Sequence, residues 1–176
     1  MLKLSNCRQS VLQAMERYKF RLDTMGFKNK KVLEVGIAGD EEYKPGKRGG
    51  NYTFFSDSNE YKTLDILKEY NPDFVGDICN TEFKDGEWDL VILSQTIEHI
   101  WTPKKAVKEC SRIIKTGGFL ILDCPWNYPQ HEELGFGDYW RITPMGIEKL
   151  CDEAGLYILE SQHSPYLVSV LAKKNE

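Results

Sequence analysis

The sequence has little that would suit an exported, membrane-spanning or nucleic-acid-coating protein. Its five cysteines are odd in number and form no CxxC pair, as in reduced structural thiols, so we expect a cytoplasmic location. The longest apolar runs, such as residues 119–122, are too short for a membrane span, and we expect no apolar leader. Lys and Arg number 23 against 27 Asp and Glu, and this net charge of −4 argues against nucleic acid as a partner.

Length and charge distribution predict one domain with a basic leading helix. The 176 residues suffice for a single core without disulfides. Residues 1–31 carry eight Lys or Arg and two acids, and apolar residues recur at helical spacing over 7–25. We therefore expect an amphipathic helix in residues 1–30 that packs on a domain of residues 31–176. Its basic face is expected to meet solvent, and contact with an anionic substrate or partner is the alternative.

Alternating strand and helix patterns predict an α/β fold with a doubly wound, mostly parallel seven-stranded sheet and an antiparallel last strand. The strands are expected at residues 31–35, 61–65, 73–75, 88–94, 119–123, 156–161 and 167–172. Besides the first helix, helices are expected at 102–115 and 143–155, each opened by a Thr-Pro pair. The segment 39–59 contains several glycines and a proline and is expected to be loop.

The turn after the first predicted strand carries the strongest functional signal. Glu34 stands two residues before Gly36 at the carboxyl end of this strand, where open α/β sheets bind ligands. The carboxylate suits a cationic group, and Asp65 at the end of the second strand can accept both hydroxyls of a ribose. The full GxGxxG pattern of a nicotinamide dehydrogenase is missing. Together these residues favour an adenosine-bearing ligand with a positive group.

These pieces resemble the class I S-adenosylmethionine-dependent methyltransferases. The matching segments are residues 32–39, 63–65, 76–78, 88–100 and 113–120, and the resemblance spans 31 to about 172. It implies a Rossmann-like methyltransferase fold with S-adenosylmethionine as cofactor. It also implies cofactor-binding residues at the methionine, ribose, adenine and methyl ends, which are Glu34, Gly36, Ala38, Gly39, Asp65, Asp77, Ile78, Ser94 and Gln95.

The long loop 124–141 follows the fifth predicted strand and is expected to cover the ligand edge. Within it His131 is the candidate catalytic base, and Trp126, Tyr139 and Arg141 are candidate substrate contacts. The alternative for the aromatic residues is that they fill the core of the loop itself.

His99 is a further substrate candidate, with a packing or capping role as the alternative. Its Glu-His pair resembles a segment that holds a divalent metal in quinone-type O-methyltransferases. Gln95 stands where an acid is expected there, so no metal is predicted.

The functional hypothesis is methyl transfer from S-adenosylmethionine to an oxygen or nitrogen of a small-molecule or glycan-like acceptor. One alternative is an RNA or protein methyltransferase that docks through the basic helix. The other is a non-catalytic cofactor-binding protein that acts through a partner. The sequence leaves the methylated atom, the use of a general base and the oligomeric state open.

Overall fold

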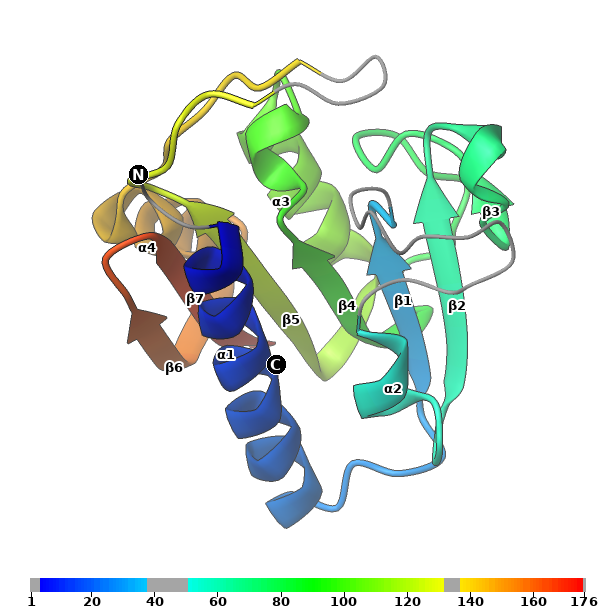
Figure 1. The fold of residues 1–176 in the computed structure, drawn as a ribbon. Helices are drawn as coiled ribbons and strands as arrows, with labels where there is room; N and C mark the ends of the chain where they lie inside the picture. The colour runs from blue at the N-terminus through cyan, green and yellow to red at the C-terminus, as the bar shows by residue number, and fades with distance from the viewer. Residues whose placement is uncertain (1–3, 38–50, 132–136, 176) are drawn as a thin grey trace.

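A computed structural model describes residues 4–37, 51–131 and 137–175, which form one sheet flanked by helices (Figure 1). In chain order the strands are β1 (Lys31–Val35), β2 (Glu60–Asp65), β3 (Phe74–Val75), β4 (Trp88–Ser94), β5 (Ile114–Pro125), β6 (Leu156–His163) and β7 (Leu167–Lys174). The helices are α1 (Leu4–Thr24), α2 (Tyr52–Phe55), α3 (Pro103–Ile113) and α4 (Pro144–Glu153), with 3-10 turns η1 (Lys68–Tyr70) and η2 (Ile97–His99).

The sheet has seven strands in the order β3-β2-β1-β4-β5-β7-β6 over the described residues. Each neighbouring pair from β3 to β5 is parallel, and β7 runs antiparallel to both β5 and β6. The reversal of strand order beside β1 creates the topological switch point at which such sheets bind ligands. The predicted fold class is confirmed.

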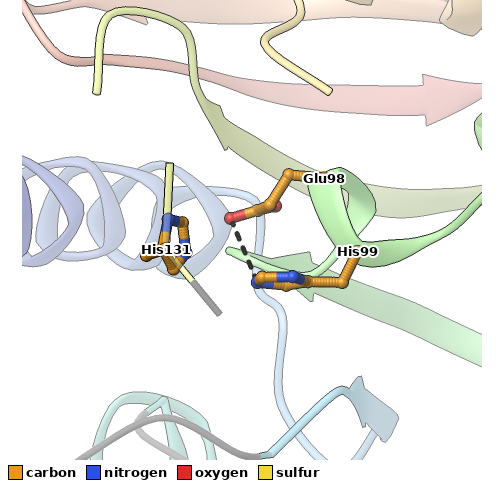
Figure 2. A group of neighbouring side chains, drawn as sticks. All are labelled: Glu98, His99 and His131. Atoms are coloured by element: carbon orange, nitrogen blue, oxygen red, sulfur yellow. Dashed lines mark ion pairs between the residues drawn. The ribbon is translucent and has the colours of Figure 1, made fainter. Parts of the chain in front are cut away.

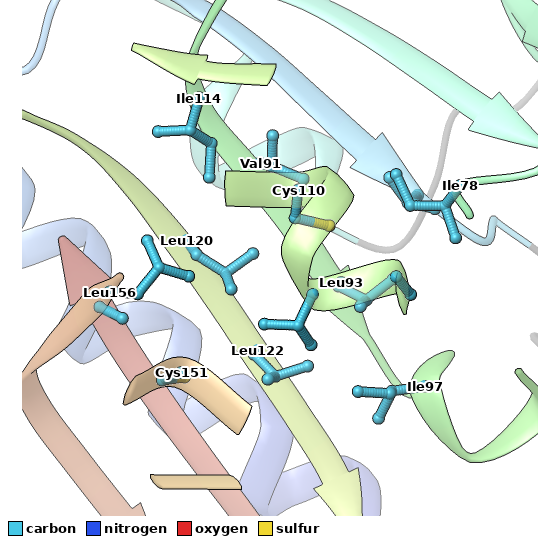
Figure 3. Close-up of a cluster of buried hydrophobic side chains, with 14 of the residues drawn as sticks. Ile78, Val91, Leu93, Ile97, Cys110, Ile114, Leu120, Leu122, Cys151 and Leu156 are labelled. Atoms are coloured by element: carbon cyan, nitrogen blue, oxygen red, sulfur yellow. The ribbon is translucent and has the colours of Figure 1, made fainter. Parts of the chain in front are cut away.

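Alternate residues of the central strand face two separate cores. Leu90 and Ile92 of β4 belong to a cluster with buried residues of α1, whereas Val91 and Leu93 belong to a cluster with residues of α3 and α4 (Figure 3). All four side chains are fully buried, as expected for a strand covered on both faces. The side-chain period of two therefore sends the apolar run of this strand into both cores.

The leading helix is part of the first of these cores. Met15, Tyr18 and Leu22 of α1 are fully buried and contact the cluster that also holds Ile121 and Leu171 of the sheet. In Figure 1, α1 and α2 lie in front of the sheet, with α3 and α4 behind it. The apolar stripe of α1 is therefore covered by the sheet, while Arg17 and Arg21 stay exposed on its opposite side.

Two predicted segments differ from the structure. Tyr52–Phe55 forms helix α2 inside the stretch 39–59 that was expected to be loop; Phe55 anchors it because its side chain is 1% exposed. Strand β5 begins at Ile114, although residues 114 and 115 were expected to be helical. Ile114 pairs with Trp88 of β4, and Gly117 takes a φ of +76° further along the strand. Strand pairing therefore overrides the local helical pattern here.

Glu109 ties α3 to the segment before β4, and its carboxylate predicts a loss of stability in acid. Its Oε1 accepts hydrogen bonds from the Thr81 backbone N (2.9 Å) and hydroxyl (2.7 Å), and its Oε2 accepts one from Arg112 Nε (2.9 Å). The Arg112 guanidinium is the main cause that lowers the pKa of Glu109 from 4.5 to about 2. Ionised Glu109 thus stabilises the fold above its ordinary pKa, and this contribution is lost as pH falls toward about 2.

We expect E109Q to lower the free energy of unfolding by about 2 kcal/mol at pH 7, since it weakens charge-assisted hydrogen bonds. Urea denaturation at several pH values measures this. The difference in the free energy of unfolding between wild type and E109Q should disappear as the pH falls from 4.5 to about 2. E16Q, at an exposed position of α1, is the control and should match wild type throughout. A gap that stays constant down to pH 2 would contradict the assignment.

The carboxyl ends of β1, β4 and β5 meet at one edge of the sheet, at the top of Figure 1. The loop after β5 runs over this edge. Among the described residues, no helix has the length and apolar character needed to cross a lipid bilayer.

Candidate functional site

The turn after β1 is built around Gly36. This residue has a φ of +73°, and its N–H donates to Leu64 O of β2 at 2.9 Å. A Cβ at this position would lie 2.3 Å from Thr96 Oγ1 and 2.9 Å from Thr96 Cβ. Thr96 is itself held, because its hydroxyl lies 3.1 Å from Val35 O and 2.9 Å from Ser94 O. Only glycine therefore fits between the turns that follow β1 and β4.

Asp65, at the end of β2, shapes the same turn. It is 3% exposed, and its Oδ2 accepts a hydrogen bond from Ile37 N at 2.9 Å while its Oδ1 accepts one from Leu67 N at 2.8 Å. Each oxygen of a carboxylate has a second acceptor site, so these bonds leave Asp65 able to accept further donors. The carboxylate thus joins the loops after β1 and β2.

Asp77 and Ile78 follow β3 at the same edge of the sheet. Asp77 is exposed and accepts a hydrogen bond from Cys79 N at 2.8 Å, whereas Ile78 is buried in the core beneath. The short Asp77 turn therefore combines an exposed carboxylate with an apolar side chain that anchors the turn in the core, and the contacts of both residues with an adenine stay a prediction.

Glu34 lies in a closed network rather than at an open surface. It is 2% exposed; its Oε1 accepts from Asn51 N (3.2 Å) and Nδ2 (2.7 Å), and its Oε2 accepts from Tyr61 Oη (2.5 Å). Burial raises the pKa of Glu34 although these hydrogen bonds lower it. In the described residues Glu34 joins β1, β2 and the start of α2, and its role at the methionine end stays a prediction. The predicted contacts Ala38 and Gly39 lie outside the described residues.

Asp123 organises the ends of β4 and β5, and it was not predicted as a site residue from the sequence. Its side chain is fully buried; Oδ2 accepts from Ser94 Oγ (2.8 Å), and Oδ1 accepts from Gln95 Nε2 (2.6 Å) and N (3.1 Å). Burial raises the pKa of Asp123 to about 6. Ser94 and Gln95, predicted to lie at the methyl end of the cofactor, are thus held by one carboxylate. The available signal was a charged residue directly after the apolar run of residues 119–122.

The amino end of α1 also reaches this group. Cys7 Sγ lies 3.7 Å from Gln95 Oε1, and Gln95 has a φ of +50°, an uncommon conformation for a residue with a Cβ. Helix α1 therefore contacts the edge where the candidate site lies.

Two histidines and a glutamate meet where η2 faces the loop after β5 (Figure 2). Glu98 Oε1 lies 3.9 Å from His99 Nε2, and the His99 and His131 rings pack edge to face with centroids 5.1 Å apart. Glu98 is fully buried, and neither of its carboxylate oxygens has a hydrogen-bond partner among the described residues. Burial raises the pKa of Glu98 to about 8. Both histidines were predicted as site residues from the sequence, but Glu98 was not.

Arg141 braces the loop after β5 instead of facing an open pocket. Its guanidinium donates two hydrogen bonds of 2.5 Å to Asp138, and it also donates to Tyr128 O and Pro129 O at 2.8 Å. The Asp138 side chain is fully buried and also accepts from His131 N at 2.7 Å. Burial raises the pKa of Asp138, but the bonds from Arg141 and His131 outweigh it and the pKa is lowered. The role of Arg141 as a substrate contact stays a prediction.

Trp126 and Tyr139, the two aromatic substrate candidates, are held by different parts of the fold. Trp126 Nε1 donates to Ser164 O (3.0 Å) in the turn between β6 and β7. Tyr139 packs edge to face on Trp101 with ring centroids 5.3 Å apart, and its N–H donates to Glu98 O at 2.8 Å. Both side chains stay partly exposed, at 37% for Trp126 and 48% for Tyr139, so both can contact a ligand.

Comparison with known proteins gives a consistent result. A family model described as a methyltransferase domain matches residues 33–122, just over half of the chain. A probable S-adenosylmethionine-dependent methyltransferase of Mycolicibacterium smegmatis is 32% identical over 50 residues, which cover 28% of this chain and 20% of that protein. The chain therefore matches about a fifth of the length of this curated relative.

Solved structures extend the similarity to the whole fold. A 1,6-didemethyltoxoflavin-N1-methyltransferase of Burkholderia thailandensis, with bound 1,6-didemethyltoxoflavin and S-adenosylhomocysteine, has a TM-score of 0.65 at 12% identity, over 93% of this chain and 79% of that one. An S-adenosylmethionine-dependent methyltransferase of Aquifex aeolicus has a TM-score of 0.60 at 15% identity, over 83% and 82%. At these identities the likeness concerns the fold.

Proposed function

Because this chain belongs to the methyltransferase domain family, whose cofactor is S-adenosylmethionine, we propose that it methylates an oxygen or nitrogen of a small-molecule or glycan-like acceptor. The observation that carries the proposal is the turn after β1. There Gly36 packs against Thr96 with no room for a Cβ, and Asp65 holds the loop by accepting from Ile37 N. This turn lies at the edge where such sheets bind nucleotides.

The residues at this edge fit an adenosine-bearing sulfonium. The Gly36 turn lets backbone approach a ligand, Asp65 keeps acceptor sites for ribose hydroxyls, and exposed Asp77 offers an acceptor for an amino group. When bound, the cofactor supplies a methyl group on a positively charged sulfur. The buried carboxylates of Glu34 and Asp123 stand near the same edge and favour a cation there.

The loop after β5 supplies the acceptor side of the proposal. Trp126 and Tyr139 offer partly exposed rings as walls, and the Arg141–Asp138 pair holds the loop that they flank. Such a loop can align an acceptor and exclude water, which are the main contributions an enzyme makes to an in-line displacement. His131, whose Nδ1 lies 3.3 Å from Asp138 Oδ2, is the residue we expect to receive the proton of an acceptor hydroxyl.

The charge of α1 favours a small acceptor over a nucleic acid. Two of its basic side chains are already paired, Arg17 with Glu160 and Lys19 with Asp23. Such pairs reduce the positive potential that a polyanion would meet. An RNA or protein methyltransferase and a non-catalytic cofactor-binding protein remain the alternative functions.

Titration calorimetry with S-adenosylmethionine and S-adenosylhomocysteine tests the cofactor part of this proposal. We expect binding to the wild type, and at least tenfold weaker binding to D77A, because the variant loses an exposed carboxylate at the adenine end. D57A is the matched control, since Asp57 is exposed in the turn before β2, at the opposite edge of the sheet.

Equal affinities of D77A and wild type would contradict the placement of the adenine. No binding of either ligand to folded wild-type protein would instead contradict both the proposed methyltransferase activity and the cofactor-binding alternative. Steep weakening of acceptor binding with salt would point to RNA.

A further inference from the structure

We propose that Glu98, His99 and His131 bind one divalent transition-metal cation of the zinc class, through one carboxylate oxygen and one nitrogen of each ring. The three residues offer ligand atoms that all lie within 4.8 Å of one another (Figure 2). Ligands about 2.1 Å from a tetrahedral zinc lie roughly 3.4 Å apart. Side-chain rotations that move the ligand atoms by about an ångström therefore bring all three to bonding distance of one ion.

The buried carboxylate of Glu98 is the first reason for a cation. Neither of its oxygens has a hydrogen-bond partner among the described residues, although the side chain is fully buried. Such a group is costly unless it is paired or binds a metal. Asp123 and Asp138 add negative charge around Glu98. The positive charge of Arg141 also acts on Glu98, but its guanidinium is paired with Asp138. A divalent cation would satisfy Glu98 and offset this excess.

Hydrogen bonds on the far side of each ring are the second reason. His99 Nδ1 lies 2.8 Å from Gly137 O, which favours the tautomer with hydrogen on Nδ1, and His99 Nε2 faces Glu98. His131 Nδ1 lies 3.4 Å from Pro129 O and 3.3 Å from Asp138 Oδ2, and the tautomer with hydrogen on Nδ1, directed to these acceptors, leaves Nε2 for a ligand. Carbonyl or carboxylate partners on one nitrogen are the usual support of a metal-binding histidine on the other.

The donor set decides the class of cation. Two imidazoles and one carboxylate suit zinc and other first-row transition metals better than calcium or magnesium, which prefer oxygen ligands. Three protein ligands leave coordination positions open, as in catalytic metal sites. No metal was predicted from the segment 95–99 alone, because Gln95 stands where an acid is expected; His131 joins the set only through the fold, from the loop after β5.

An open position would give the cation a role at the acceptor, and this part rests on the proposed function. An acceptor hydroxyl bound there would become more acidic, and its proton would leave to solvent. His131 would then act as a ligand and not as the base.

The test begins with protein treated with a chelator and dialysed. Calorimetry with Zn²⁺ should give one equivalent for wild type, and Co²⁺ should produce visible d–d bands without the charge-transfer band of a thiolate ligand. H99Q, H131Q and E98Q should each bind Zn²⁺ at least tenfold more weakly. H163Q removes the remaining histidine of the chain, which is exposed on β6, and should bind like wild type.

Weakened binding confined to the three cluster variants supports the site. Binding by H99Q and H131Q equal to wild type overturns it, as does a thiolate band or no binding at all. H131Q keeps the test decisive if a buried variant fails to fold, because the His131 side chain is 32% exposed. S-adenosylhomocysteine titrated in the presence of chelator tests the proposed function separately, so either can fail alone.

Discussion

Replacing Gly36 with alanine is expected to abolish measurable binding of S-adenosylhomocysteine and to lower the free energy of unfolding. The new Cβ would lie 2.3 Å from Thr96 Oγ1, so the turn after β1 or the turn after β4 must move. The φ of +73° lowers the free energy of unfolding by about 1 kcal/mol when the residue has a side chain. The steric conflict adds about 1–3 kcal/mol, as in overpacked cores.

The control for this variant is G155A, at the end of α4. Gly155 has the same φ of +73°, but a Cβ there would meet nothing within 4 Å. G155A should therefore lose only the stability that a positive φ costs a residue with a side chain, and it should bind S-adenosylhomocysteine like wild type. Calorimetry and urea denaturation measure both effects. Unchanged binding by folded G36A would refute the placement of the cofactor at this turn.

The R141A variant is expected to show the second large effect. It leaves the fully buried Asp138 carboxylate without its main partner and removes the donors to Tyr128 O and Pro129 O. Breaking a buried ion pair lowers the free energy of unfolding by about 3–5 kcal/mol. We expect a loss of about 3 kcal/mol here, because the Arg141 side chain is 24% exposed. The loop that carries His131 should also be cut faster by proteases, because its hydrogen bonds are lost.

R17A serves as the matched control, since it removes the same chemical group from an exposed pair with Glu160. The Arg17 side chain is 63% exposed, so R17A should change the free energy of unfolding by less than about 1 kcal/mol. Urea denaturation of both variants decides the matter. If R141A were as stable as R17A and equally resistant to protease, Arg141 would not brace the loop.

The strands show what local pattern can predict. Lys31–Val35 and Trp88–Ser94 were predicted with the bounds that the structure has. Gly36 marks the end of the first, and the second holds the continuous apolar run that is typical of strands buried on both faces. The hairpin of β6 and β7 was predicted from its short connection, and it supplies the antiparallel strand of the sheet. Local signals were enough wherever burial is strong and turns are short.

Where non-local pairing decides, the same reasoning was wrong. The start of β5 at Ile114 depends on Trp88, which is 26 residues earlier in the chain, and the helical pattern before it gave no sign of this. The short helix α2 depends on Phe55, whose side chain fills a place in the core beside α1. Such contacts join segments whose separate patterns are ambiguous.

At the candidate site the sequence by itself determined the sheet edge, the Gly36 turn and the acids that end β2 and follow β3, because each belongs to one strand and its own turn. Only the tertiary structure decided which side chains meet. It placed His131 against Glu98 and His99, engaged Arg141 with Asp138, and enclosed Glu34 between Asn51 and Tyr61. These contacts follow from strand order and from the path of the loop after β5, which no local period encodes.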